Sequence, residues 1–190
     1  MDEAYRTLLE HLQASRGGEF ARLDATRVLI VSGPARREAR ATIRGFASSA
    51  THPFRKPTVR RSGVGIDYEI CLRPLFFRHC TAQQRLLILI HELWHAAPAF
   101  DGTLNPEHRH DQRSQRDIDR SVRKIAEPWL ERDRADELEF LQYEGELRME
   151  SWLVRPPSHV PSDNDRERTE YDERLLFSAI IEQRNQRAPA

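Results

Sequence analysis

The segment 81–98 constrains the fold more than any other part of the chain. Thr81 and Gln84 form the pattern T-x-x-Q, a capping box in which each side chain bonds the other residue's backbone N–H at a helix start. No glycine or proline follows until Pro98, and the aliphatic run 86–90 covers almost every side of such a helix. Because a helix that is apolar all round is a buried one, we expect this helix to lie under a sheet.

Two histidines and a glutamate stand at the end of this apolar run. His91 and His95 are one turn apart and separated by roughly 40° around the helix axis, so both imidazoles point the same way. Two neutral imidazoles placed like this can bind one zinc ion (Zn2+) at roughly 2.0–2.1 Å each. Glu92 stands beside them, where it can take a proton from water, the general-base role of the H-E-x-x-H motif. The alternative is a pair of satisfied core histidines with Glu92 in an ion pair.

A catalytic zinc site needs a third protein ligand and one open position. Pro98 and Asp101 occupy the positions at which a metzincin has Gly and His, which excludes that class. His110 is the preferred third ligand because it stands next to the start of a predicted helix, and His108 is its main alternative. The acidic alternatives are Glu107, Asp111, Glu127 and Glu131.

The rest of the chain indicates a mixture of helices and strands. Apolar residues at helical spacing predict helices at 2–14, 112–126 (ended by Pro128), 130–143 (capped by Gly145) and 164–186. Alternating or β-branched runs predict strands at 27–32, 39–47, 66–72 and 146–154. The polar segment 48–63, with two prolines, predicts a loop. Without βαβ regularity, these elements favour a single α+β domain over 1–190, with a core at about 20–155 and a C-terminal helix within 160–190.

Charge is unevenly distributed along the chain, although the net charge is zero. The segment 36–61 carries eight basic residues against one glutamate, and the segment 131–150 carries eight acidic residues against three arginines. Such asymmetry indicates either a surface that faces nucleic acid or two faces that complement each other within the fold. Aromatic residues do not alternate with these arginines, which favours the second interpretation.

The two cysteines and the apolar runs bear on the compartment. Cys71 and Cys80 lack CxxC spacing and predict reduced, partly buried thiols. The N-terminal segment is acidic and amphipathic rather than basic and then apolar, and the longest apolar run is far too short to cross a bilayer. We therefore expect a cytoplasmic protein that has no membrane partner.

The stretch HELWHAAPAFDGTL, followed by H-R-H, resembles the predicted zinc metallopeptidases of phages and bacteria, which are similar in outline to the compact SprT-like zincins. The resemblance covers about residues 64–125. The matching positions are His91, Glu92 and His95, then Pro98, Phe100, Asp101 and Gly102, then His108 or His110. It implies a zincin-like domain in which a small sheet packs on the H-E-x-x-H helix, with further C-terminal helices. It also implies one zinc ion and a peptide or protein substrate, laid as an extra strand on a sheet edge. The strand at 66–72 is the candidate for that edge, and the alternative is that it is a fully paired interior strand.

Several residues are candidates for supporting roles around such a site. Tyr68, Tyr143 or an arginine would donate to the oxyanion. Asp101 would either orient one of the histidines or, as the preferred interpretation, cap the turn at Gly102.

The expected function is that of a zinc-dependent metallopeptidase, which hydrolyses peptide bonds with a metal-activated water and Glu92 as general base. One alternative is a non-catalytic binding protein in which a metal braces the helix against the 108–110 loop. The other is a nucleic-acid-associated protease that uses the arginine-rich segment 36–61. Activity that survives Glu92→Gln would favour the first alternative, and DNA binding with a steep salt dependence would support the second.

Overall fold

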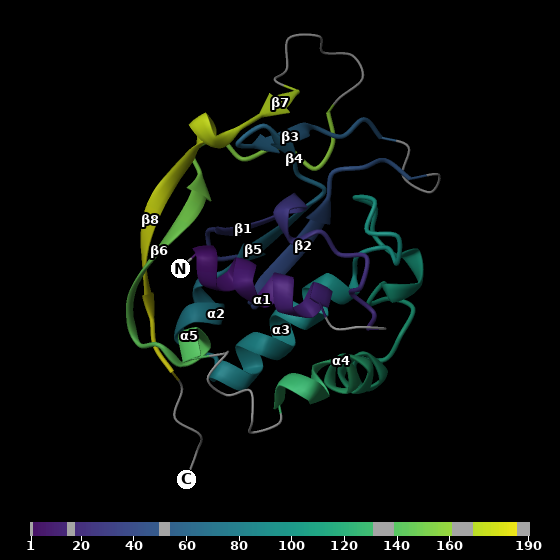
Figure 1. The fold of residues 1–190 in the computed structure, drawn as a ribbon, viewed down its shortest axis with the longest axis vertical. Coiled ribbons are helices and arrows are strands. Elements are labelled where there is room, and N and C mark those ends of the chain that lie inside the picture. The colour runs from purple at the N-terminus through teal and green to yellow at the C-terminus, as the bar shows by residue number, and fades with distance from the viewer. Residues whose placement is uncertain (1, 15–17, 50–53, 131–138, 161–168, 186–190) are drawn as a thin grey trace.

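A five-stranded mixed sheet with the strand order β2-β5-β1-β6-β8 forms the centre of the computed structural model (Figure 1). The structure describes residues 2–14, 18–49, 54–130, 139–160 and 169–185. The sheet consists of β1 (Val28–Ser32), β2 (Ala41–Gly45), β5 (Tyr68–Leu72), β6 (Gly145–Trp152) and β8 (Leu176–Gln183). β1 runs parallel to β5 and β6, whereas β2 and β8 are antiparallel to their neighbours and form the two edges within the described part of the chain.

Helices cover one face of this sheet and a small second sheet covers the other (Figure 1). The helices are α1 (Asp2–Ala14), α2 (Pro74–Arg78), α3 (Ala82–Trp94), α4 (Gln115–Leu130) and α5 (Glu139–Gln142). The small sheet consists of β3 (Thr58–Arg61), β4 (Val64–Gly65) and β7 (Glu170–Tyr171), with β3 in the middle. Val28 and Ile30 of β1 face the helices, while Leu29 and Val31 face the small sheet, so both sides of the strand are buried.

Most elements with a strong local pattern lie where the sequence predicts them. The helix at 2–14 and the strands within 27–32, 39–47, 66–72 and 146–154 are present. At the start of α3, the Gln84 N–H donates to Thr81 Oγ1 at 3.2 Å and the Thr81 N–H donates to Gln84 Oε1 at 2.9 Å, so the capping box is confirmed. The helix is not buried all round, however, because Leu87 and Ile88 are half-buried and line a cleft. The chain is a mixed α+β fold.

The predicted C-terminal helix is wrong in the part that the structure describes. Leu176–Gln183 is the strand β8, which pairs with β6 over its full length. The apolar residues of this stretch fit both a helical and a strand period, and pairing with β6 decides between them. As a strand, β8 turns Ile181 and Gln183 toward the core and leaves Ile180 64% exposed. The predicted residues 164–168 and 186 lie outside the described residues.

Three smaller predictions are also wrong. The predicted loop 48–63 contains β3, whose Val59 packs against the face of the main sheet that is opposite the helices. Pro128 does not end α4, because Pro128 and the residue one turn before it, Lys124, are both exposed, so solvent can satisfy the carbonyl that the proline leaves unbonded. Gly145 opens β6 instead of capping a helix. Of the helix predicted at 130–143, residues 131–138 lie outside the described residues, and 139–142 form α5.

The strand 66–72 is not a sheet edge. β5 lies between β2 and β1, so both of its edges are paired, and the edge next to α3 is β2. The local sequence of 66–72 does not predict this pairing, because β2, the strand on the outer side of β5, comes from earlier in the chain.

Two further observations concern the thiols and the helices. Cys71 and Cys80 are both buried and form no disulfide, so the two side chains are packed inside the fold. Among the helices that the structure describes, none is long and apolar enough to cross a membrane.

Candidate metal centre

The H-E-x-x-H motif lies at the C-terminal end of α3, facing a cleft. His91 is in the last turn of the helix and His95 is its C-cap, while the neighbouring Ile90 and Leu93 are buried in the core. The Nε2 atoms of His91 and His95 lie 3.1 Å apart. Two nitrogens that bind one tetrahedral zinc at roughly 2.05 Å each are separated by roughly 3.3 Å, so the helix already holds this pair at ligand spacing.

A tight turn leads the chain from His95 back toward the cleft. The backbone adopts positive φ at Phe100 (50°) and Gly102 (86°), and a Cβ on Gly102 would lie 3.1 Å from the Ala47 Cβ. Asp101 Oδ1 accepts the backbone N–H of Thr103 at 3.0 Å, which confirms that Asp101 caps this turn. The Tyr68 hydroxyl accepts the Gly102 N–H at 3.0 Å and donates to the Thr103 carbonyl at 2.8 Å. Tyr68 therefore holds the turn and is not placed as an oxyanion donor.

His110 completes a cluster with the two helix histidines. Its ring centroid lies 5.1 Å from that of His91 and 4.8 Å from that of His95, and one nitrogen of each of the three residues lies within 4.8 Å of the others. His110 is exposed on a loop, so its ring is the one that can adjust to a bound ion. The three histidines lie close enough together to bind a metal ion.

His108, the alternative third ligand, points elsewhere. Its ring stacks on Trp94 with a centroid distance of 3.7 Å and an interplanar angle of 9°, and its Nδ1 lies 2.5 Å from the Trp94 carbonyl oxygen. The short 3-10 helix Pro106–His108 directs the side chain to this position. His108 therefore packs on Trp94 and is not part of the cluster, whereas His110 is part of it.

Burial keeps the helix histidines neutral, which is the form that binds metals. Burial, followed by the like charge of His110, lowers the pKa of His91 to about 4, and Asp119 partly opposes this shift. Burial lowers the pKa of His95 to about 4 as well, with His91 and His110 adding to the effect. The His108 backbone partly opposes the lowering of the His95 pKa.

Glu92 lines the same cleft as the histidines. It is only 8% exposed, and burial raises its pKa to about 7, while the Ile43 backbone and the Arg73 charge oppose the shift. Ile43 of the edge strand β2 lines the same part of the cleft as Glu92. A buried carboxyl beside three metal-binding side chains can exchange a proton near neutral pH.

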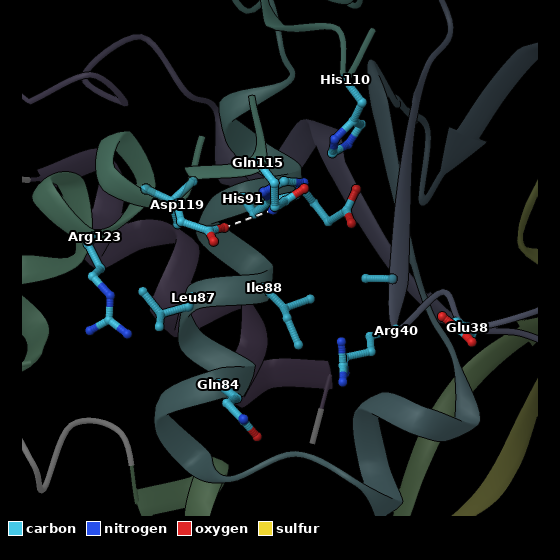
Figure 2. A pocket seen from close by; sticks show the side chains of 13 residues that line it. Glu38, Arg40, Gln84, Leu87, Ile88, His91, His110, Gln115, Asp119 and Arg123 are labelled. Carbon is cyan, nitrogen blue, oxygen red and sulfur yellow. Dashed lines mark hydrogen bonds between the residues drawn. The ribbon is translucent and has the colours of Figure 1, made fainter. Parts of the chain in front are cut away.

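The cleft extends on both sides of the cluster and includes residues that the sequence did not single out. Its larger part has a volume of about 730 Å³ and lies between α3, α4 and the residues before β2. Figure 2 shows Leu87 and Ile88 on its floor, Arg40 on one side, and Asp119 and Arg123 of α4 on the other. Asp119 accepts a hydrogen bond from Gln115 at 2.8 Å. The sequence placed Asp119 in a predicted helix, but gave no signal that it would face His91.

The other acidic and aromatic candidates lie apart from the cluster. Among the described residues, His91, His95 and His110 are the only group that meets the geometric criterion for a metal site, and no acidic residue joins them. Asp111 is exposed and lies 3.5 Å from Arg109. Tyr143 is 45% exposed and contacts Gly145 at the start of β6. Glu131 lies outside the described residues.

The arginine-rich segment 36–61 is partly used inside the fold. Arg44 pairs with Glu69 at 2.5 Å, and Arg61 pairs with Glu150 at 2.9 Å. Its other arginines, Arg36, Arg37, Arg40, Arg55 and Arg60, are exposed. Binding to nucleic acid stays a prediction.

Comparisons with known proteins add nothing to this geometry. No protein-family model, no curated protein and no solved structure matches this chain.

Proposed function

We propose that this protein is a zinc-dependent metallopeptidase. The observation that carries the proposal is the cluster of His91, His95 and His110 with Glu92 in the same cleft. The cluster unites two residues of one helix turn with a third that follows a constrained loop. Among the described residues, no acidic side chain joins these three histidines, so their nitrogens are left to an ion.

Zinc fits the donor set better than magnesium or calcium. Imidazole nitrogens suit zinc, whereas magnesium and calcium prefer oxygen ligands. Three histidines with the remaining position open to the cleft match the arrangement of catalytic rather than structural zinc sites. When bound, zinc lowers the pKa of a coordinated water and polarises the carbonyl of a peptide bond.

Glu92 supplies the proton transfers that peptide hydrolysis needs. Its carboxylate takes a proton from the attacking water and delivers it to the leaving nitrogen. The packing of α3 against β2 buries the carboxylate and holds it in position during both steps. A cation at the three histidines offsets the burial of Glu92 and keeps it ionised and ready to accept.

The edge strand β2 gives the cleft a means of holding a peptide. Among the described residues β2 pairs with β5 alone, and its Ile43 lines the cleft together with Glu92, so the unpaired edge faces the cleft. An extended peptide added along this edge gains main-chain hydrogen bonds that do not depend on its sequence. Its scissile bond would then pass over the histidines and Glu92.

The test is cleavage of an unstructured protein such as casein by purified protein, after removal of metal and after reloading with one equivalent of zinc. We expect cleavage only after reloading, and a loss of about 10²–10⁴-fold in the Glu92→Gln variant. Glu182→Gln, a change of the same kind on the exposed face of β8, serves as the matched control and should retain full activity. Cleavage that survives Glu92→Gln, or zinc-loaded protein that cleaves nothing, would contradict the proposal.

A further inference from the structure

A second pocket adjoins the metal cleft at the far end of β2. Its volume is about 380 Å³. Leu104, Asn105 and Arg109 line this pocket and also line the part of the cleft that contains His95 and His110. The groove beside β2 therefore continues from the histidines to this pocket. We call it the basic pocket, because its charged lining residues are Arg44, Lys56 and Arg109.

Positive charge exceeds negative charge around the basic pocket. Arg44 Nη2 lies 2.5 Å from Glu69 Oε2, but Arg155 claims the other oxygen of the same carboxylate at 2.9 Å. Arg109 lies 3.5 Å from Asp111, and both side chains are largely exposed, so this pair is weak. With Lys56 included, four cations surround the pocket against three carboxylates, those of Glu69, Asp111 and Asp101, and Asp101 already accepts two hydrogen bonds from Thr103.

Lys56 is the lining cation that has no carboxylate partner among the described residues. Its Nζ donates to the Ser158 carbonyl at 2.9 Å, and the described part of the chain offers it no carboxylate. Burial, and then the neighbouring Arg44 charge, lower the pKa of Lys56. An anion in the pocket would offset both effects.

The opposite end of the cleft is electrically balanced. Figure 2 shows Glu38 with Arg40 on one side and Asp119 with Arg123 on the other, above an apolar floor. That end suits an uncharged side chain. The two ends of one groove therefore differ in the charge that they select.

We propose that the basic pocket binds an acidic side chain of an extended peptide substrate, on one side of the scissile bond only. This inference rests on the proposed peptidase function, since it names what the same cleft selects. Ile43 of β2 is beside Glu92, and the strand residues Arg44 and Gly45 line the basic pocket. A strand advances roughly 3.4 Å per residue, so the pocket begins to meet side chains roughly one to two residues from the scissile bond.

An acidic peptide fits this pocket better than a nucleic acid does. None of the residues that line it is aromatic, whereas single-stranded nucleic acids are held largely by stacking on aromatic side chains. The pocket is also a single site at the end of a groove, which suits one carboxylate better than a chain of phosphates.

Binding can be tested without turnover, by using the zinc-loaded Glu92→Gln protein and a short neutral peptide in which one glutamate is moved position by position. We expect one position on one side to bind at least about tenfold more tightly than its glutamine counterpart, as one charge-assisted hydrogen bond provides. Lys56→Glu should abolish this preference. Arg55→Glu, the same charge change at an exposed neighbour outside the pocket, should keep it.

The outcomes separate this inference from the proposed function. Equal binding of the glutamate and glutamine peptides, or equal effects of Lys56→Glu and Arg55→Glu, would contradict the proposal that the basic pocket binds an acidic side chain. This would hold even if zinc-loaded protein cleaves casein. A glutamate preference that depends on Lys56 would support the pocket even if nothing is cleaved. An oligonucleotide that binds the pocket and displaces the peptide more effectively than free glutamate peptide would overturn it in favour of nucleic acid.

Discussion

Two buried glutamates, Glu69 and Glu92, show how differently this fold treats a carboxylate. Glu69 is fully buried and accepts three hydrogen bonds from charged or polar donors, Arg44 Nη2, Arg155 Nη2 and Trp152 Nε1. Glu92 is 8% exposed, and burial raises its pKa to about 7. The chain supplies Glu69 with enough donors for its charge but leaves Glu92 short of them.

The difference indicates which carboxylate serves the fold and which serves chemistry. A buried charge with a full set of partners contributes to structure, because its partners already satisfy it. A buried carboxyl with few partners is costly to maintain unless a ligand or an ion completes its surroundings. The three histidines beside Glu92 provide the place for such an ion.

The largest contrast is expected when each glutamate is replaced by glutamine. Glu69→Gln leaves two arginines without a carboxylate and should lower the free energy of unfolding by about 3 kcal/mol, near the low end for a broken buried pair because Arg155 is partly solvated. Glu92→Gln removes a charge that the fold does not satisfy and should leave stability unchanged or raise it. Urea unfolding of the metal-free proteins measures both. A larger loss for Glu92→Gln than for Glu69→Gln would contradict the comparison.

The pH dependence of stability should sharpen the comparison. Glu92 in the metal-free folded protein titrates near 7, above its ordinary value of 4.5, so the folded state binds more protons between these values. Its contribution is complete below about pH 4.5 and is lost as the pH rises through 7. The histidines contribute in the opposite direction, because their lowered pKa values favour the folded state above about 6.5 and that contribution is lost as the pH falls toward 4.

The difference between wild type and Glu92→Gln isolates the glutamate from the histidines. Wild type should lose roughly 2–3 kcal/mol relative to the variant between pH 4.5 and 8, at about 1.4 kcal/mol per pKa unit. Urea unfolding of both metal-free proteins across this range provides the measurement. Parallel stability curves would show that Glu92 titrates normally and that the contrast with Glu69 is absent.

The smallest effect is expected at His108. Its ring stacks on Trp94 behind the cluster, so His108→Ala should cost about 1 kcal/mol of stability, the value of one aromatic pair. Thermal unfolding followed by circular dichroism would detect this loss. His110→Ala is the matched control, since the exposed His110 meets the other two histidine rings only at tilted angles and centroid distances of 5.1 and 4.8 Å, and should cost less. If His110→Ala is the more destabilising change in metal-free protein, the assignment of the two histidines is wrong.

Local patterns were enough to predict the central helix and half of its site. The capping box, the apolar run and the four-residue spacing of His91 and His95 all act within one helix, so their geometry follows from the helix itself. The strands β1, β2, β5 and β6 have alternating or β-branched sequences that few other structures accommodate. For such elements the tertiary contacts reinforce a choice that the sequence already makes.

Non-local contacts decided the rest. β8 is a strand because β6 lies beside it, and its own sequence fits a helix equally well. Which of His108 and His110 can be the third metal ligand depends on the position of Trp94, on which the His108 ring stacks. That position does not follow from the spacing of the two histidines in the sequence. Asp119 and the basic pocket were missed for the same reason, since residues far apart in the chain meet there only after folding.

The zinc content of the purified protein tests the central claim most directly. Elemental analysis should find one equivalent of zinc in wild type and in His108→Ala, and none in His91→Ala or His110→Ala, with all four proteins folded by circular dichroism. That result would establish the cluster as a metal site and identify His110 as its third ligand. Wild-type protein that carries no metal and cannot be loaded with zinc would show that the cluster is not a metal site, and the peptidase proposal would then be wrong.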